Sequence, residues 1–193
     1  RGIRRYFTVA SSPYEDTIRL GVKEAEKGST FKQNLLALHE GEGVLATSVS
    51  GDFLLPDDPS KKLVFIAGGI GITPFVSMLR TLLITHDKRD IVVFYSNKTE
   101  EEIAYKYVLE QAEEELGVTV VHVLSDVEKL ASDWKGEKGF ITSEMIEKFV
   151  KDYKERKYYI SGPPGMVASY TTLLGGMGIS SFNVTTDFFP GLA

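Results

Sequence analysis

The fold of this chain is decided by residues 63–74, which read LVFIAGGIGITP. The run Leu63–Ala67 is continuously apolar, as expected for a strand that is buried on both faces. Thr73 and Pro74 predict the start of a helix, with threonine as the N-cap and proline at the first helical position. Phe75, Leu79, Leu82 and Leu83 then give this helix a buried stripe.

The glycine-rich turn Gly68–Pro74 joins that strand to that helix. Its glycines let the backbone approach an anionic ligand closely, and the helix N-terminus offers free amides and the positive end of a dipole. Ligands of open parallel sheets bind at this end of the strands. The alternative is a tight turn that binds nothing. The pattern differs from the standard dinucleotide fingerprint, because Pro74 replaces the third glycine.

Strands and helices alternate from this turn to the end of the chain. Such alternation implies parallel pairing and right-handed crossovers. Residues 61–193 are therefore predicted to form a doubly wound parallel-sheet nucleotide-binding domain. The further elements are strands at Ile91–Tyr95, Val118–Leu124, Lys157–Ile160 and Ser181–Thr185, and helices at Glu101–Glu115, Thr142–Lys151 and Met166–Leu174.

Residues 1–60 have β character. The polar residues 57–62 then serve as a linker. A short helix is expected after Gly28-Ser29-Thr30, with Phe31, Leu35, Leu36 and Leu38 mostly on one face. The predicted strands are Arg5–Ala10, Ile18–Val22, Val44–Val49 and Phe53–Leu55.

Composition excludes several classes of protein. The 193 residues include no cysteine, which rules out disulfides and the thiolate ligands of iron–sulfur clusters. The net charge of −5 argues against nucleic-acid binding. No run approaches the roughly 20 apolar residues that span a bilayer, and no signal peptide is visible. Because residue 1 is Arg, we expect a fragment of a longer chain.

Two further groups of residues are of types that can bind a ligand. Residues 161–166, SGPPGM, form a second glycine turn after a strand, although a proline-stiffened connection is the alternative. On the first strand, Arg5 and Phe7 share one face while Tyr6 and Thr8 share the other. An arginine pairs with phosphate, an aromatic ring faces a flat ring, and a hydroxyl bonds a ring nitrogen. Taken alone, this strand reads as an ordinary barrel strand.

In this order and spacing, the motifs resemble the ferredoxin–NADP reductase superfamily, including cytochrome b5 reductase-like and phenol hydroxylase reductase-like flavoproteins. The resemblance covers nearly the whole chain and implies that residues 1–60 form a partial antiparallel FAD-binding barrel. It implies that Arg5 binds the FAD pyrophosphate, Phe7 packs on the isoalloxazine and Thr8 bonds near flavin N5. Val22 and Lys23 match the next FAD-contacting strand. Ser29, Thr30, Phe31 and Lys32 match the segment that caps the pyrophosphate.

For the nicotinamide nucleotide, the resemblance implies a pyrophosphate on Gly69 and Gly71 and a nicotinamide beside Ser161. Ser96 and Lys98 suit a 2′-phosphate, whereas Glu102 resembles the acidic position that accepts ribose hydroxyls, which favours NADH slightly. An acidic first helical turn is the plain alternative. The implied catalytic residues are Thr8 and Ser161, and the implied cofactor-binding residues are Arg5, Tyr6, Phe7, Thr8, Val22, Lys23, Ser29, Thr30, Phe31, Lys32, Gly69, Gly71, Thr73, Pro74, Ser96, Asn97, Lys98, Glu102, Gly162, Pro163, Met166 and Phe188.

The sequence departs from the family pattern at three places. Ser161 stands where the family has cysteine, so a slower hydride step is expected. The two barrel strands that the family places before the Arg5 strand are missing, which leaves FAD retention open. Near the C-terminus, Phe188 or Phe189 is expected to lie over the flavin, and a loose hydrophobic tail is the alternative.

The resemblance implies a reductase that passes electrons from NADH or NADPH through FAD to a separate redox protein or domain. The rivals are a flavin reductase that releases reduced flavin and a non-catalytic nucleotide-binding module. A cytoplasmic location is expected, alone or as part of a larger membrane electron-transfer protein with an upstream membrane or redox domain. His39, His86 and His122 show no catalytic or metal-ligand spacing. The basic stretch 148–157 is read as a solvated face, with docking of an acidic partner as the alternative.

Overall fold

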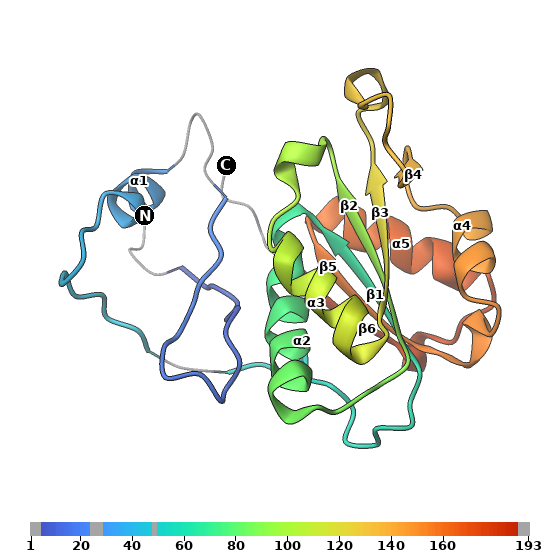
Figure 1. Ribbon diagram of the computed structural model, residues 1–193, viewed down its shortest axis with the longest axis horizontal. Coiled ribbons are helices and arrows are strands. Elements are labelled where there is room, and N and C mark those ends of the chain that lie inside the picture. The colour runs from blue at the N-terminus through green and yellow to red at the C-terminus, as the bar shows by residue number, and fades with distance from the viewer. Residues whose placement is uncertain (1–4, 24–28, 48–49, 189–193) are drawn as a thin grey trace.

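A computed structural model describes residues 5–23, 29–47 and 50–188. Within them, a parallel sheet has the strand order β4-β3-β2-β1-β5-β6 (Figure 1). The strands are β1 (Leu63–Gly68), β2 (Ile91–Asn97), β3 (Thr119–Leu124), β4 (Glu137–Lys138), β5 (Lys157–Gly162) and β6 (Val184–Phe188), and the α-helices are α1 (Thr30–Leu36), α2 (Thr73–Thr85), α3 (Lys106–Leu116), α4 (Ser143–Phe149) and α5 (Pro164–Gly176).

The chain runs from β1 outward to β4 and then returns to place β5 on the other side of β1. The gap between β1 and β5 is therefore a topological switch point, where open α/β sheets bind ligands at the carboxyl ends of the strands. The register pairs Ala67 of β1 with Ser161 of β5, and Ser161 with Asp187 of β6. Both predicted glycine turns thus leave the sheet at this point.

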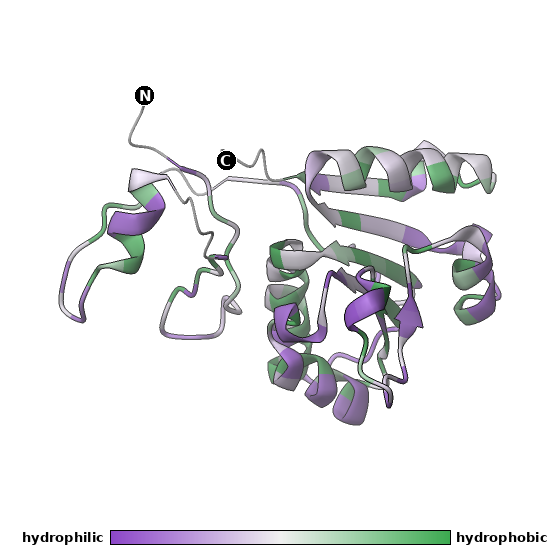
Figure 2. Cartoon of the chain, turned by 90° about the horizontal axis from the view of Figure 1, so that it is seen from above, coloured by the Kyte–Doolittle hydropathy of each residue, from purple (hydrophilic) through white to green (hydrophobic). Residues whose placement is uncertain are grey.

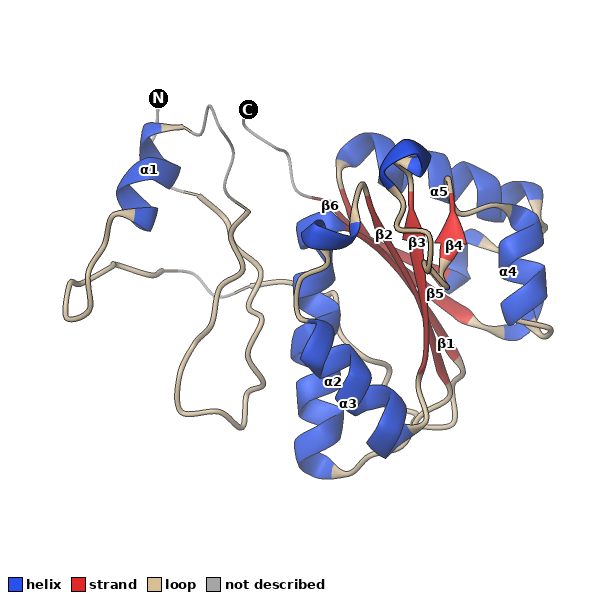
Figure 3. Ribbon diagram, turned by 45° about the horizontal axis from the view of Figure 1, so that its top comes forward, coloured by secondary structure: helices blue, strands red, loops and turns tan. Residues whose placement is uncertain are grey.

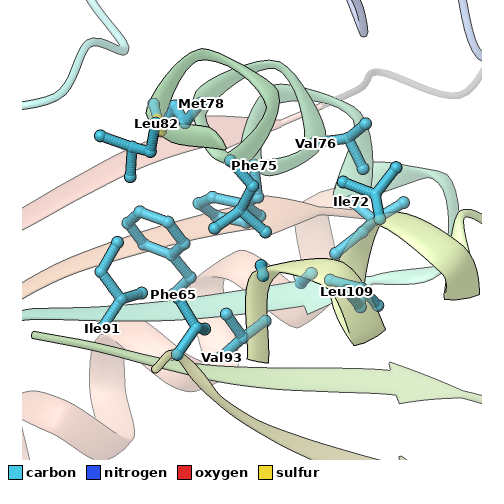
Figure 4. Close-up of a cluster of buried hydrophobic side chains, with 14 of the residues drawn as sticks. Phe65, Ile72, Phe75, Val76, Met78, Leu82, Ile91, Val93 and Leu109 are labelled. Carbon is cyan, nitrogen blue, oxygen red and sulfur yellow. The ribbon is translucent and has the colours of Figure 1, made fainter. Parts of the chain in front are cut away.

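Helices cover both faces of the sheet, as the sequence predicted. The pair α2 and α3 packs on one face, and α4 and α5 pack on the other (Figure 3). Every residue of β1 is buried, because Phe65 faces α2 while Val64 faces the α4–α5 side. Phe65 stacks on Phe75 of α2 with ring centroids 4.5 Å apart (Figure 4). Figure 2 shows hydrophobic residues along the central strands and hydrophilic residues on the outer turns of the helices.

The start of α2 differs from the prediction. Thr73 is not the N-cap but the first helical residue, because a 3₁₀ turn over Gly69–Ile72 leads directly into the helix. The Thr73 hydroxyl donates to the Ile70 carbonyl at 3.1 Å. Pro74 does lie in the first helical turn. The helix axis is thereby extended back toward the glycines, which keeps their amides next to its N-terminus.

The described residues between 5 and 62 do not form the predicted barrel. Among the described residues of this region, the β pairing is one isolated antiparallel bridge between Val9 and Leu20. The strands expected at 5–10, 18–22, 44–49 and 53–55 are therefore wrong, although residues 48 and 49 lie outside the described part. A two-stranded pairing is marginal in water unless further strands or a helix cover it. Here Tyr6 and Leu45 stay 92% and 89% exposed.

The helix α1 begins where the sequence predicted. The Ser29 side chain caps it by accepting from the Lys32 amide at 3.4 Å. Its predicted buried face is wrong, because Leu36 and Leu38 are exposed. The face has no partner sheet in the described part of this region, so nothing excludes water from it.

Three later elements also differ from the prediction. Residues 100–102 form a 3₁₀ turn and α3 starts only at Lys106, because Tyr105 has a left-handed φ of 57° that breaks the helix. Ser181–Asn183 form another 3₁₀ turn, capped by the Ser180 side chain, and β6 follows it. The two-residue β4 was not predicted, since it carries no strand pattern of its own. No helix among the described residues is long and apolar enough to cross a membrane.

The basic stretch 148–157 is not a uniformly solvated face. Arg156 is 7% exposed, and its guanidinium pairs with Asp90 at 2.6 Å and Asp152 at 2.7 Å. Lys62 also reaches Asp152, at 2.7 Å. The arginine therefore joins the starts of β1 and β5 to the loop before β2. This network lies at the opposite end of the strands from the glycine turns.

Candidate active site

The two glycine turns meet at the switch point of the sheet. A Cβ built on Gly71 would overlap the Ser161 carbonyl oxygen and lie 2.7 Å from the Cα of Gly162. Only glycine at 71 therefore allows the turn after β1 to pack against the turn after β5. Gly69 has φ of +52°, and a Cβ there would meet nothing within 4 Å. The backbone at Gly69 thus borders open space, as the approach of a ligand requires.

Met166 lies across the floor between these turns. A Cβ on Gly68 would overlap the Met166 sulfur, and one on Gly162 would lie 2.7 Å from its methyl carbon. Met166 comes from the first turn of α5, which Pro164 begins, while Pro163 and Pro164 are exposed. The Met166 thioether therefore fills the space between Gly68 and Gly162.

Ser161 is a buried polar residue where the two glycine turns meet. Its side-chain oxygen is fully buried and has no hydrogen-bond partner in the structure. A buried hydroxyl without a partner is unfavourable and is expected where a ligand supplies the missing bond. Thr73 lies nearby at the start of α2 and is 2% exposed. The predicted pair Ser161 and Thr73 is thus brought to adjacent strand ends.

Thr8 reaches the same edge of the sheet through Asp187. Burial raises the pKa of the Asp187 carboxyl above its usual range, and hydrogen bonds from the Phe188 backbone and the Thr8 side chain oppose that rise. Asp187 is the register partner of Ser161. Thr8, Asp187 and Ser161 therefore form one line across the carboxyl end of β6 and β5. Asp187 was missed by the sequence reasoning, because the strand predicted there ended at Thr185 whereas β6 runs to Phe188.

The segment around Val22 approaches the first glycine turn. A Cβ on Gly21 would overlap the methyl of Thr73 and lie 2.8 Å from the Tyr105 hydroxyl oxygen. Lys23 pairs with Glu102 at 3.0 Å. Val22 lies between these two contacts. Residues predicted to touch the flavin are thereby placed directly against residues predicted to touch the nucleotide.

Arg5, Phe7 and Phe31 form a separate cluster. The Arg5 guanidinium lies 5.4 Å from the centre of the Phe31 ring. Phe7 stacks on Phe31 with ring centroids 6.1 Å apart. Tyr6 points to solvent, so Arg5 and Phe7 share a face as the alternation predicted. A cation and two flat rings, the groups needed for a dinucleotide, are thus close together, and Thr30 is exposed at the start of α1.

The predicted specificity residues follow β2. Ser96 pairs in register with Gly68, and its side chain bonds the Tyr170 hydroxyl, whose pKa is raised mainly by burial. Asn97 is buried and Lys98 is exposed. Lys98 stays a predicted contact. The carboxylate of Glu102 accepts from the Lys98 amide at 3.4 Å as well as pairing with Lys23.

Phe188 ends β6 beside Gly162 and is 55% exposed. Its ring is accessible at the edge where Thr8 and Asp187 lie. Phe189 falls outside the described residues. Among the described residues, no group of three or more His, Cys, Asp or Glu side chains is placed to hold a metal ion.

Comparison with known proteins identifies the class of this fold and site. A family model described as an oxidoreductase NAD-binding domain matches residues 65–172. This range is more than half of the chain, so the protein belongs to that family, within the FAD- and NAD(P)-binding reductases of the ferredoxin–NADP reductase type. The resemblance inferred from the motifs is thereby confirmed.

The relatives include proteins named as reductases. The chain is 28% identical over 177 residues to the glycine betaine monooxygenase reductase subunit of Pseudomonas aeruginosa, covering 91% of this chain and 48% of that protein. It is 27% identical over 188 residues to the flavohemoprotein of Bacillus subtilis, covering 96% and 46%. The crystal structure of the Amycolatopsis cytochrome P450 reductase GcoB superimposes with a TM-score of 0.81 at 27% identity, covering 95% of this chain and 55% of that one. The chain spans about half the length of the curated relatives it matches.

Proposed function

We propose that this chain takes a hydride from NADH or NADPH onto FAD and passes the electrons singly to a separate redox protein or domain. The observation that carries the proposal is the meeting of two glycine turns at the switch point, with Thr8 and Gly21 against the same edge. Two flat rings have to touch for hydride transfer, and such positioning is the protein's main contribution. Residues 61–193 would bind the nucleotide and residues 1–60 the flavin.

The nucleotide side fits a pyrophosphate and a nicotinamide. Open space borders the backbone at Gly69, and the amides of the 3₁₀ turn and the dipole of α2 favour an anion there. The unpartnered Ser161 hydroxyl is available to a carboxamide or ring. Thr73 and Pro74 fix the turn, while Gly162 and Pro163 shape the opposite wall. When bound, the nicotinamide supplies the hydride and the isoalloxazine accepts it.

The flavin side supplies a cation, a flat ring and a hydroxyl. Arg5 would pair with the pyrophosphate, and Phe7 and Phe31 would face a ring once they separate from each other. Thr8 would hydrogen-bond near the reactive nitrogen of the flavin ring in place of the bond that it donates to Asp187. Asp187, whose pKa burial raises, holds a proton at its carboxyl more readily than an exposed aspartate. The electron acceptor is proposed to be a redox protein or domain, as the named monooxygenase reductase subunit suggests for this class.

The test is to add FAD, remove the excess and follow the flavin absorbance after anaerobic addition of NADH or NADPH. We expect retained yellow colour and bleaching, and Thr8→Ala should slow bleaching more than it weakens nucleotide binding. If the protein retains FAD but neither NADH nor NADPH reduces it, the chain is a non-catalytic nucleotide-binding module. An unchanged reduction rate in Thr8→Ala would remove that residue from the mechanism.

A second candidate, a flavin reductase that releases its product, is favoured by one observation. The described residues before Leu63 form no closed barrel, and their apolar side chains are largely exposed. A flavin held there would exchange readily with solvent. Failure to retain FAD on a desalting column, combined with fast NADH oxidation when free FMN or riboflavin is present, would select this function over the first.

A further inference from the structure

Gly21 lies in a seat formed by three side chains of the nucleotide-binding domain. A Cβ built on Gly21 would overlap the Thr73 methyl and lie 2.8 Å from the Tyr105 hydroxyl oxygen. The same Cβ would lie 3.1 Å from the terminal methyl of Ile70. The backbone at Gly21 therefore packs directly on these side chains, which only a glycine allows. Two of the three belong to the glycine turn after β1 and to the start of α2, and Tyr105 comes from the loop before α3.

Tyr105 brings its hydroxyl to this seat from a strained backbone. Its φ of 57° is in the left-handed region, which a residue with a bulky side chain rarely adopts. Tyr105 is also the N-cap of α3, yet its side chain makes no capping hydrogen bond. Serine, threonine, asparagine or aspartate would supply that bond. Local stability is thus given up at the residue that meets Gly21, and such strain is typical of functional positions.

A second left-handed residue shows what this conformation does elsewhere in the chain. Among the described residues, His86 is the other non-glycine residue with a positive φ, of 55°. It is exposed and ends α2, where its amide donates to the carbonyls of the last turn, as is common at the end of a helix. Tyr105 begins a helix instead, and burial raises the pKa of its hydroxyl. Helix termination therefore does not account for Tyr105.

We propose that Tyr105 is a positioning residue, which supports Gly21 and so sets the distance between the flavin side of the site and the glycine turn after β1. The inference rests on the proposed function and adds to it a residue that acts through Gly21. Val22 and Lys23, the predicted flavin contacts, follow Gly21 directly. Loss of the phenol would let them move away from the turn. Hydride transfer would then slow, because it depends on how closely the two cofactor rings are held.

Stopped-flow flavin reduction over a range of NADH concentrations separates the limiting rate from the affinity. Tyr105→Asn should lower the limiting rate about tenfold and change the Kd for NADH less than about twofold, since asparagine tolerates the left-handed backbone and the loop keeps its path. Tyr105→Phe keeps the ring and should lose only about threefold. His86→Asn is the matched control, because it makes the same exchange at an exposed left-handed position, and should change neither quantity. An unchanged limiting rate in Tyr105→Asn, or an equal loss of rate and affinity, overturns the proposal.

Amide hydrogen exchange tests the seat without FAD or a hydride donor. Exchange in residues 18–22 should speed up at least about threefold in Tyr105→Asn and stay unchanged in His86→Asn. Gly21→Ala should have the same effect, because its methyl would overlap the seat, and Gly43→Ala is its control, since a Cβ there meets nothing within 4 Å. If the wild-type protein never reduces FAD, the proposed function fails and exchange still decides whether the seat holds this segment. Unchanged exchange in Tyr105→Asn refutes the support of Gly21 itself.

Discussion

The regions before and after residue 63 both contain many apolar residues, but they bury those residues to very different extents. From Leu63 onward, strands and helices bury nearly all their apolar side chains in two layers. Before it, the buried residues of the described part are Ala10, Ser11 and Ser12. Ile18, Leu45 and many others face solvent. Apolar content alone therefore does not produce a core. Each strand or helix also needs neighbouring elements that cover its apolar face.

The difference lies in where each element finds its partners. A parallel α/β sheet finds strand and helix partners within one continuous stretch of chain. A barrel strand needs neighbours on both sides, and the described residues of 5–62 do not provide them. The front region is attached by a few apolar contacts, in which Ala10, Phe53 and Leu55 pack against the core beside α2, and by polar contacts. The Ser77 hydroxyl donates to the Ser11 carbonyl at 2.7 Å, and the Tyr159 hydroxyl to the Leu54 carbonyl at 2.8 Å.

The largest expected contrast is a matched pair of core truncations. Phe65→Ala should lower the free energy of unfolding by about 4 kcal/mol, because it removes a fully buried ring stacked on Phe75. Leu45→Ala should change it by less than about 0.5 kcal/mol, since that side chain is 89% exposed. Urea unfolding of both variants measures the difference. Similar losses would mean that the front region is packed in solution.

The next contrast compares two glycines of the site. Gly71→Ala should destabilise the protein by about 2 kcal/mol, because the added methyl overlaps the Ser161 carbonyl. The displaced turn should also weaken NADH binding at least tenfold, on the order of 1.4 kcal/mol. Gly175→Ala, at the far end of α5 where a Cβ meets nothing within 4 Å, should do neither. Fluorescence titration with NADH checks the binding, and equal affinity in all three proteins would exclude this turn as the phosphate cradle.

These contrasts explain which parts of the structure the sequence could predict. The alternation from residue 63 onward identified the parallel sheet, because each element carries its own periodicity and finds its partners nearby. The same method placed strands before residue 60 from β-like composition alone. β-like composition shows only that the residues suit the half-buried surface of a strand. It does not show that a neighbouring strand is present to pair with them. The barrel prediction failed for that reason.

The sequence could predict those parts of the candidate site that directly follow a predicted strand. The motif at 68–74 and Ser161 lie at strand ends that the alternation had already placed side by side. Asp187 and the Lys23–Glu102 pair depend on contacts between segments far apart in sequence, which no local pattern encodes. The left-handed Tyr105 was equally hidden, because nothing in its neighbours requires a positive φ.

A smaller effect is expected on acidification. Burial raises the pKa of Asp152, but hydrogen bonds from Arg156 and Lys62 outweigh it, and the net pKa falls from 3.8 to about 2. Its stabilisation is therefore complete above about pH 4 and is lost as the pH falls toward 2. Because solvent screens these charges, the stabilisation contributed by Asp152 is on the order of 1 kcal/mol. Thermal unfolding of Asp152→Asn should lose this part of the pH dependence, and a curve parallel to the wild type would contradict the assignment.

The smallest change in stability is expected at Ser161, where one substitution tests a role in flavin reduction and a role in folding separately. Ser161→Ala should alter the free energy of unfolding by less than about 1 kcal/mol, or raise it, because the buried hydroxyl has no partner to lose. If that hydroxyl orients the nicotinamide, flavin reduction should slow roughly tenfold in the same variant. Chemical unfolding and stopped-flow reduction, with Ser169→Ala as the exposed control, measure the two quantities. A large loss of stability with unchanged reduction would make Ser161 part of the packing of β5 and not of the site.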